Sequence, residues 1–190
     1  VVFKNGAQVG KVTKKSFFVN KATGKSTSSN VAYRFKPDNP GAKDYSEFNF
    51  CGLTNGIRGY LNHVHPWVAF KPAQYTEIIV DLDTITSFRK IRYGVMNGYG
   101  QEAVAPESVD IEISNDSISF KRIASKKFTY TISNKWQMFE QKFNFEPQKA
   151  RYVKLRFKNG KLPHKLGGFP VPKKREGELG LLFIDEIEIK

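Results

Sequence analysis

The stretch TEIIVDL, Thr76–Leu82, carries the pattern that decides the fold. Successive side chains of a strand point to opposite sides of a sheet, so Ile78, Val80 and Leu82 share one face. The same period of two recurs in SVDIEIS, Ser108–Ser114, where the apolar residues oppose two carboxylates. This alternation predicts strands of a pleated sheet and not helices.

The alternation continues along the chain, and no stretch has a convincing helical period. We expect further strands at Arg89–Val95, Met138–Phe145, Arg151–Phe157 and Phe183–Ile189. Asn-Gly pairs, prolines and Ser/Asn clusters separate the runs as hairpin and inter-sheet turns do. Short strands with turns at this spacing predict an all-β fold, either a β-sandwich or a jelly roll.

Three segments depart from this pattern. Residues 1–19 read as a hairpin, and residues 20–56 are polar and turn-rich with a single expected strand at Val31–Phe35. Residues 159–180 form an excursion rich in Gly, Pro and Lys. Irregular stretches of this length in a compact domain are either binding loops or mobile loops.

The length and composition limit the number of domains and the kinds of partner that the chain can have. The 190 residues suffice for one substantial core, or for one core with a fragment of a second. Thirty-one Lys and Arg against eighteen Asp and Glu give a net charge of +13, which favours polyanionic partners. The stretch Arg151–Arg175 holds nine Lys or Arg and no acid. We weigh a polyanion-binding stripe there against a solvated outer strand face.

Several classes of protein are excluded or disfavoured. The single cysteine, Cys51, cannot form an internal disulfide or a Cys-rich zinc site. No apolar run approaches the roughly 20 residues that span a bilayer. The start of the chain lacks a signal-peptide pattern and falls within an expected strand, so we expect a fragment of a longer protein. No nucleophile or metalloprotease motif is present, and adjacent Asp185 and Glu186 would point to opposite strand faces, unlike a glycosidase pair.

One segment has the chemistry of sugar binding. NHVHPWVAF, Asn62–Phe70, gathers an amide, two imidazoles and an indole. Planar hydrogen-bonding groups hold hydroxyls, and an aromatic face packs on the apolar face of a sugar ring. The alternative for Trp67 and Phe70 is burial in the core at the start of a strand. His63 and His65 would supply only half of a transition-metal site.

A resemblance to a known family enters at LTNGIRG, Leu53–Gly59, followed by Asn62-His63 and WVAF. These blocks resemble the discoidin-like (coagulation factor 5/8 type C) module of bacterial family 20 β-N-acetylhexosaminidases, the chitobiases. Later blocks are similar in the same order: IIVDLDTITSFRKIRYGVMNG, APESVDIEISNDSISFKRI, ARYVKLRFKN and LLFIDEIEIK. Residues 1–20 resemble the last hairpin of the small immunoglobulin-like domain that precedes the module in those enzymes.

The resemblance implies a galactose-binding-like jelly-roll β-sandwich over residues 21–190, after a hairpin of a preceding small β-domain over residues 1–20. It implies a non-catalytic module that binds carbohydrate, or orients substrate, beside the barrel of an exported glycoside hydrolase. The expected ligands are N-acetylglucosamine- or galactose-type glycans, the expected partner is the catalytic domain of the same chain, and the expected location is periplasmic or extracellular.

The resemblance also implies two sets of site residues. The sugar contacts would come from loops at one end of the sandwich: Asn62, His63, His65, Trp67, Phe70, Tyr99 and Gln101. Related modules often hold a structural calcium, whose ligands here would be Asn55 and Glu186. Asn55 stands where the family has Asp, and a neutral amide is a weaker calcium ligand than a carboxylate.

Two alternatives to sugar binding stay open. The module could pack against the rest of its parent protein and bind nothing, or it could bind anionic polymers such as a sulfated glycan or a nucleic acid. Steep salt dependence of binding would indicate the second alternative.

Overall fold

The structure is a computed structural model that describes residues 2–4, 7–9, 19–32, 52–59, 61, 67–98, 102–130, 135–166 and 168–190. Within these ranges the elements are strands and one short 3-10 helix. They are β1 (Val2–Lys4), β2 (Ala7–Val9), β3 (Thr27–Ser29), β4 (Val68–Phe70), β5 (Tyr75–Asn97), β6 (Ser108–Ser114), β7 (Lys121–Lys127), β8 (Gln137–Lys158), β9 (Lys165–Leu166), β10 (Phe169–Pro170), η3 (Lys173–Arg175), β11 (Leu182–Ile184) and β12 (Glu188–Ile189).

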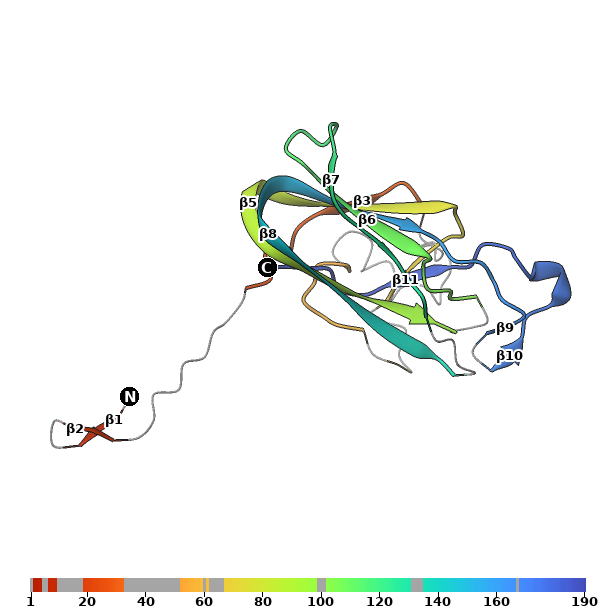
Figure 1. Ribbon diagram of the computed structural model, residues 1–190, viewed down its shortest axis with the longest axis horizontal. Coiled ribbons are helices and arrows are strands. Elements are labelled where there is room, and N and C mark those ends of the chain that lie inside the picture. Colours follow the sequence, from red (N-terminus) through yellow and green to blue (C-terminus); the bar gives the residue numbers. More distant parts are fainter. Residues whose placement is uncertain are drawn as a thin grey trace, which may run out of the picture.

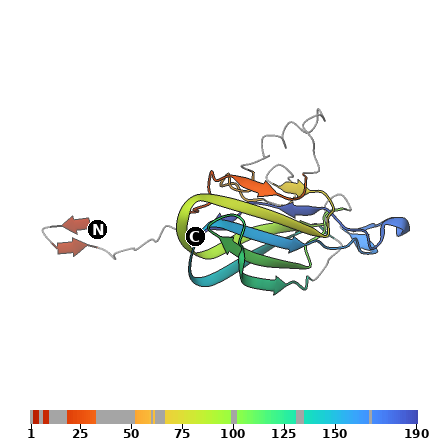
Figure 2. The same cartoon turned by 90° about the horizontal axis from the view of Figure 1, so that it is seen from above.

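Two long antiparallel strands, β5 and β8, form the frame of the domain. They pair from Tyr75 opposite Lys158 to Asn97 opposite Gln137, with register shifts near residues 81–86 and 88–90. Asp83 has a φ of 66° at the first shift. Figures 1 and 2 show both strands bending sharply there, so that each continues from one layer into the other.

The bend corrects the strand boundaries expected from the sequence. Residues 76–82 and 89–95 are two halves of β5, and residues 138–145 and 151–157 are two halves of β8. The apolar alternation is interrupted at the bend, where Ile85 is exposed, because that stretch turns around the edge of the core. Backbone pairing nevertheless resumes on both sides of the interruption.

The bent pair creates a two-layered sandwich from one continuous antiparallel sheet. The strand order is β4-β11-β5-β8-β6-β7, with β3 and β12 also paired to β5. One layer holds β3, β6, β7 and residues 75–82 of β5; the other holds β4, β11, β12 and residues 91–97 of β5. This confirms the all-β, galactose-binding-like sandwich that the alternation and the resemblance predicted.

The core fills the space between the layers. Tyr93 stacks on Phe143 at 6.2 Å between ring centroids and meets Phe157 edge-on at 5.3 Å. The inward residues of the TEIIVDL and SVDIEIS runs are buried as predicted: Ile78, Val80, Leu82, Val109 and Ile111. Burial of side chains of this size contributes about 1.5–3 kcal/mol each, so this central set carries much of the stability.

The C-terminal run differs from the expected two-faced strand. Residues 181–189 are buried on both faces and divide into β11 and β12, with Asp185, Glu186 and Ile187 between them. The reason is that the 52–59 loop packs on this run: Ile187 N donates to the carbonyl of Leu53 at 2.7 Å, and Gly59 N donates to the Asp185 carboxylate at 3.1 Å.

The N-terminal part is described in pieces. β1 pairs with β2 in register Val2–Val9 and Lys4–Ala7, which confirms a hairpin shorter than the one predicted over residues 1–19. The strand in the polar region lies at Thr27–Ser29, where it pairs with β5, and not at Val31–Phe35. Residues 33–50, including most of that predicted strand, lie outside the described residues, and the domain boundary at residue 20 stays a prediction.

No helix that could cross a membrane occurs among the described residues, whose single helix is the three-residue η3.

Candidate functional site

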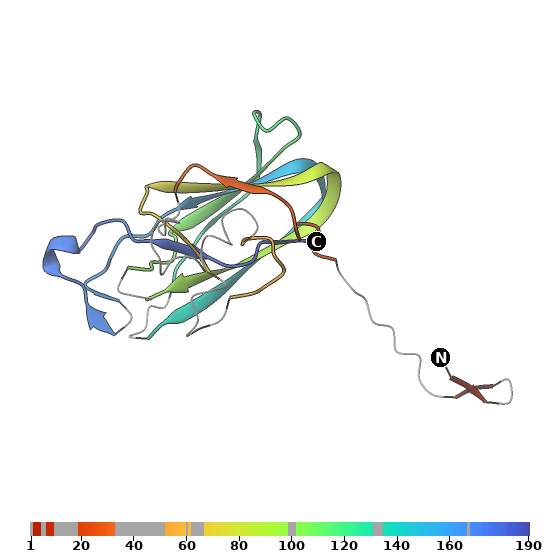
Figure 3. The same cartoon turned by 180° about the vertical axis from the view of Figure 1, so that it is seen from behind.

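The irregular segment with β9, β10 and η3 lies at one end of the sandwich, away from the C-terminus, as Figures 1 and 3 show from opposite sides. A buried cluster contains Trp67, Met96 and Ala103, together with Ala69, Leu181 and Phe183. Trp67 directly follows residues 62–66 in the sequence, and Met96 and Ala103 lie on either side of residues 99–101. One apolar cluster therefore contains residues next in sequence to both stretches that carry the predicted sugar contacts, while those stretches themselves lie outside the described residues. We call this part of the molecule the loop end.

The base of the second segment is held by the backbone. Gly98 N donates to the carbonyl of Ala103 at 2.8 Å, and Gly98 has a φ of 96°, a conformation that glycine adopts without strain. The buried Asn97 side chain accepts a hydrogen bond from Ala105 N at 3.1 Å. These contacts hold Asn97 and Gly98 beside residues 103–105.

The 159–180 excursion packs at the same end. Leu162, Leu166 and Val171 bury against Val104, and Gly180 N donates to the carbonyl of Gly160 at 2.9 Å. A side chain at Gly160 would collide with Val104 Cγ1 at 2.6 Å, so close backbone approach requires glycine there. The predicted binding or mobile loop is therefore attached to the loop end by its own small core.

The predicted sugar contacts divide into two groups. Asn62, His63, His65, Tyr99 and Gln101 lie outside the described residues, so their role stays a prediction. Trp67 and Phe70 are fully buried, which corrects their prediction as sugar contacts: neither ring presents a face to a ligand. Trp67 directly precedes β4, and its indole packs inward because burial removes a large apolar area from water.

A hollow of about 440 Å³ on β7 and β8 borders the loop end and was missed from the sequence. Three aromatic rings line it in series: Phe128 stacks on Tyr130 at 5.4 Å, and Tyr130 lies 4.5 Å from Phe139. Gln137 and Gln141 add amide groups, so the hollow combines the aromatic and planar polar groups that hold sugars. The alternation in Phe128-Thr129-Tyr130 is the signal that could have indicated it.

Five of the nine cations in the basic stretch 151–175 pair with acids from other parts of the chain. On the strand face, Lys154 lies 2.6 Å from Glu112, Arg156 3.0 Å from Glu77 and Lys158 2.6 Å from Glu107. Arg151 pairs with Asp81 through two hydrogen bonds of 2.9 and 3.0 Å, and Arg175 pairs with Glu102 and Glu178. These pairs favour the interpretation as an outer strand face over a polyanion stripe.

The LTNGIRG block is a clamp on the C-terminal segment. The fully buried Asp185 accepts hydrogen bonds from Gly59 N at 3.1 Å and from Gly94 N, and Arg58 Nε lies 3.4 Å from it. Burial raises the pKa of Asp185, against the lowering effect of Arg58 and of the two N–H groups. The position next to Trp67 leaves no space for a side chain at Gly59, whose Cβ would meet the indole Nε1 at 2.8 Å.

Glu186 and Asn55, the predicted calcium ligands, lie on neighbouring segments beside this clamp. Burial raises the pKa of Glu186 to about 7, against a lowering hydrogen bond from the backbone of Gly56. Its Oε1 accepts from Asn20 Nδ2 at 2.8 Å, while its buried Oε2 finds no partner among the described residues. Asn55 Oδ1 accepts from Ile57 N at 2.9 Å. The Glu186 Oε2 atom, a carboxylate oxygen without a partner among the described residues, is suited to bind a cation. The Asn55 Oδ1 atom has a second lone pair and could serve as a weaker ligand.

The comparisons with known proteins agree with this architecture. The sequence profile of the F5/8 type C domain matches residues 43–166. No curated protein sequence matches the chain. Among solved structures, chitosan-binding module 1 of a chitosanase/glucanase from Paenibacillus sp. IK-5 superposes with a TM-score of 0.56 at 15% identity, over 91% of this chain and 99% of that one.

Two further structures are similar. The lectin domain of lectinolysin, solved with Lewis B antigen, has a TM-score of 0.55 at 17% identity over 90% of this chain and 96% of that one. A module from Clostridium perfringens, solved with GalNAc-β-1,3-galactose, has a TM-score of 0.52 at 14% identity over 87% and 94%. At these identities the likeness shows a shared fold. Because the profile covers well over half of the sequence, the chain belongs to the F5/8 type C (discoidin-like) domain family.

Proposed function

We propose that this domain binds carbohydrate without catalysing its conversion, and that the loop end is the binding surface. The observation that supports the proposal is that Trp67, Met96 and Ala103, which lie next to residues 62–66 and 99–101 in the sequence, share one buried cluster of a domain of this family. We therefore expect His63 and Tyr99 to lie at the same end of the fold. The three similar structures are a chitosan-binding module, a lectin domain with a bound antigen and a module with a bound disaccharide. Their ligands support the class of ligand proposed here.

The mechanism is reversible docking. Imidazole and amide groups of the 62–66 segment hydrogen-bond sugar hydroxyls, and Tyr99 offers a ring to the apolar face of a sugar. A shallow site buries little of its ligand, so we expect a Kd for one sugar on the order of millimolar. Linked to a catalytic domain, the module raises the local concentration of substrate. The hollow at Phe128 and Tyr130 lies next to this surface and can take a further sugar of a chain.

We propose as parent an exported β-N-acetylhexosaminidase of the chitobiase type, with its catalytic barrel on the same polypeptide. The blocks LTNGIRG and LLFIDEIEIK support this parentage through their resemblance to that module. The location is then periplasmic or extracellular. Deletion of the module from the full enzyme should lower activity on polymeric chitin more than on a soluble chromogenic substrate. An equal loss on both substrates would instead support a purely structural packing role.

We also propose a calcium ion at Glu186, held through Oε2, with Asn55 and nearby backbone carbonyls as further ligands. The buried carboxylate without a partner for Oε2 supports the proposal. Bound there, calcium would neutralise the Glu186 charge and tie the 52–59 loop to the C-terminal segment. Because Asn55 is neutral, we expect binding at the weak end of the range of extracellular modules, about 1 mM.

Sugar binding is tested by calorimetric titration with N-acetylglucosamine, galactose, chitooligosaccharides and lactose. His63→Ala and Tyr99→Ala should each weaken binding at least about fivefold, the loss of one hydrogen bond or ring contact at 1 kcal/mol. His164→Ala is the matched control, because His164 is exposed and its ring pairs with Glu176 at 2.8 Å. An absence of heat and of any competition across the panel would contradict the proposal.

A further inference from the structure

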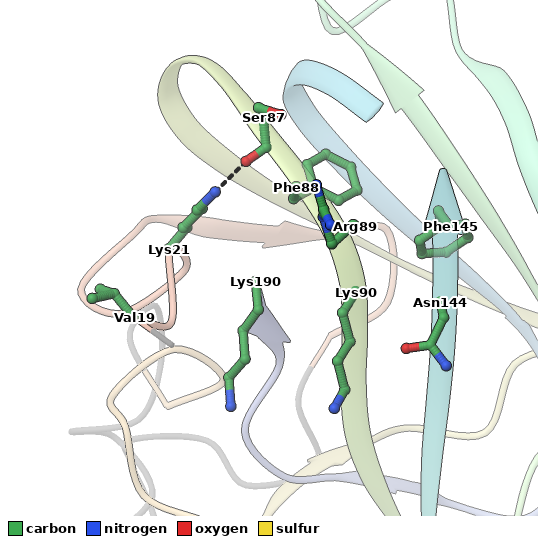
Figure 4. A pocket seen from close by; sticks show the side chains of 9 residues that line it. All are labelled: Val19, Lys21, Ser87, Phe88, Arg89, Lys90, Asn144, Phe145 and Lys190. Atoms are coloured by element: carbon green, nitrogen blue, oxygen red, sulfur yellow. Dashed lines mark hydrogen bonds between the residues drawn. The ribbon is translucent and has the colours of Figure 1, made fainter. Parts of the chain in front are cut away.

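A second hollow lies at the opposite end of the sandwich, where the chain enters the sheet at residues 19–21 and reaches Lys190. Its volume is about 600 Å³, within the range of small-ligand sites. Figure 4 shows its lining, drawn from the entering segment, from β5, from β8 and from the residue after β12. Four of the nine lining residues are cationic, and none is acidic: Lys21, Arg89, Lys90 and Lys190.

The sheet places three of the lining side chains next to one another: Lys190, Lys90 and Asn144. Lys90 and Lys190 exchange two backbone hydrogen bonds of 2.9 Å, which makes them directly opposed residues of an antiparallel pair. On its other side Lys90 pairs with Asn144 of β8. Directly opposed residues point to the same face, so an amide and two ammonium groups line up across three chain segments. Like charges in opposed positions repel. Glu188 offsets the charge of Lys190, and an anion bound beside Lys90 would remove the remaining cost.

Most of this charge lacks an acidic partner. Within the described ranges, neither Arg89 nor Lys90 has a carboxylate within ion-pair distance, and Lys21 donates to the backbone carbonyl of Ser87. Lys190 alone has an acidic partner, Glu188, at 2.5 Å. This contrasts with the 151–158 strand face, where each cation that alternates with the core residues meets a carboxylate. The hollow therefore gathers three cations, Lys21, Arg89 and Lys90, that have no acidic partner among the described residues.

The hollow also has an apolar wall. Phe88 and Phe145 meet edge to face at 6.5 Å, and Phe145 is only half-buried. Val19 is 76% exposed at the rim, and the Asn144 amide is exposed beside Lys90. An apolar wall, an amide and unpaired cations in one cavity match a sugar ring that carries a negative group: aromatic carbon against the C–H face, amide to hydroxyl, ammonium and guanidinium to the anion.

We propose that this hollow is a second glycan site, selective for an acidic saccharide whose carboxylate or sulfate lies between Lys90, Lys190 and Arg89. The proposal extends the carbohydrate-binding function to a surface at the other end of the domain. It rests on that function only in the choice of a glycan as the source of the anion. A module with both sites could hold an acidic glycan at one end and a neutral one at the other.

The test measures binding of the full chain to fluorescent octasaccharides by anisotropy at low and at physiological salt. A heparin octamer presents sulfates, an oligogalacturonate octamer presents carboxylates alone, and a single-stranded oligonucleotide of equal charge presents phosphates without saccharide hydroxyls at the anion. The variant Lys90→Gln/Lys190→Gln removes two charges from the hollow. The matched control Lys173→Gln/Lys174→Gln removes two exposed charges from η3 at the loop end.

We expect the first variant to bind at least one acidic octamer about tenfold more weakly, which corresponds to about 1.4 kcal/mol shared by two exposed charge contacts. The control should change binding less than twofold, and the stronger of the two octamers identifies the preferred anion. Arg89→Gln should also weaken binding, and thermal melts establish that each variant is folded. Equal losses in both double variants, or equal affinity for the oligonucleotide, would overturn the proposal in favour of diffuse charge attraction.

The failure of this proposal can be told from failure of the neutral-sugar function. Lys90→Gln/Lys190→Gln should leave titration with chitooligosaccharides unchanged, and Tyr99→Ala should leave the acidic octamers unchanged. Loss of neutral-sugar binding in the hollow variant would overturn the separation of the two sites. If the chain binds acidic octamers but no neutral sugar, the result would support the acidic-glycan site at the hollow and contradict the neutral-sugar site at the loop end.

Discussion

Removal of the Asp185 carboxylate should destabilise the domain more than any surface substitution. Asp185→Ala leaves the backbone N–H groups of Gly59 and Gly94 without an acceptor in a site with no solvent exposure. Each buried unsatisfied donor costs about 1–3 kcal/mol. Arg58 still has two carboxylate partners in this variant, Glu140 at 3.1 Å and Glu188 at 3.5 Å. The loss of its contact with Asp185 therefore adds little to the free-energy cost. We expect a total cost of about 3 kcal/mol.

The assay is urea denaturation followed by tryptophan fluorescence at pH 7. Asp110→Ala is the matched control: the Asp110 side chain faces outward on β6, lies 3.6 Å from Arg122, and should cost less than about 1 kcal/mol. Gly94→Ala tests the same contact from the other partner, because the new Cβ would lie 2.7 Å from Asp185 Oδ2. An Asp185→Ala protein within 1 kcal/mol of wild type at an unchanged m-value would refute the clamp.

Three further predictions concern charge, metal and core. Hydrogen bonds from Arg151 lower the pKa of Asp81, so the contribution of this pair is present above about pH 4 and is lost as the pH falls through the folded-state pKa. The difference in melting temperature between Arg151→Gln and wild type should therefore narrow below pH 4; a constant difference would contradict the ion pair. Ten millimolar calcium, about ten times the expected Kd, should stabilise the chain by about 1.4 kcal/mol, or about 3–6 °C, over a chelator control. Glu186→Gln should abolish that shift and Asn55→Asp should enlarge it, whereas a shift retained in Glu186→Gln would exclude the site. Tyr93→Phe should be neutral or stabilising by up to about 1 kcal/mol, because the buried Tyr93 hydroxyl finds no partner among the described residues; a loss above 1 kcal/mol would show that it has one.

The fold could be predicted from the sequence because the layer that holds β6 and residues 75–82 of β5 is partly solvated on its outer side. That arrangement leaves a clear apolar alternation in TEIIVDL and SVDIEIS. The C-terminal run was misjudged for the opposite reason: it is covered on both sides, so its acids Asp185 and Glu186 sit in a buried clamp and not on a solvated face. The continuity of β5 through its bend was invisible because backbone hydrogen bonds, and not side-chain pattern, maintain it.

The candidate sites could be predicted from the sequence only in part. The crowding of polar and aromatic groups in Asn62–Phe70 indicated a sugar site, but the pattern could not tell which rings turn inward, and Trp67 does. The cationic hollow joins residues from four separate segments, 19–21, 87–90, 144–145 and 190. The β5–β8 and β5–β12 pairings and the backbone hydrogen bond from Lys21 to Ile189 bring these segments together in space. The basic stretch 151–175 suggested a polyanion stripe because the acids that pair with its strand-face cations lie far away in the sequence.

Backbone chemical-shift mapping tests the central claim most directly. A ¹⁵N-labelled chain is titrated with neutral chitooligosaccharides and galactosides to about ten times the expected millimolar Kd. We predict shifts of amides at the loop end, around Leu61, Gly98 and Glu102, with Lys90 and Lys190 unaffected. Spectra that stay unchanged with every saccharide, or shifts confined to the opposite end of the sandwich, would contradict the account.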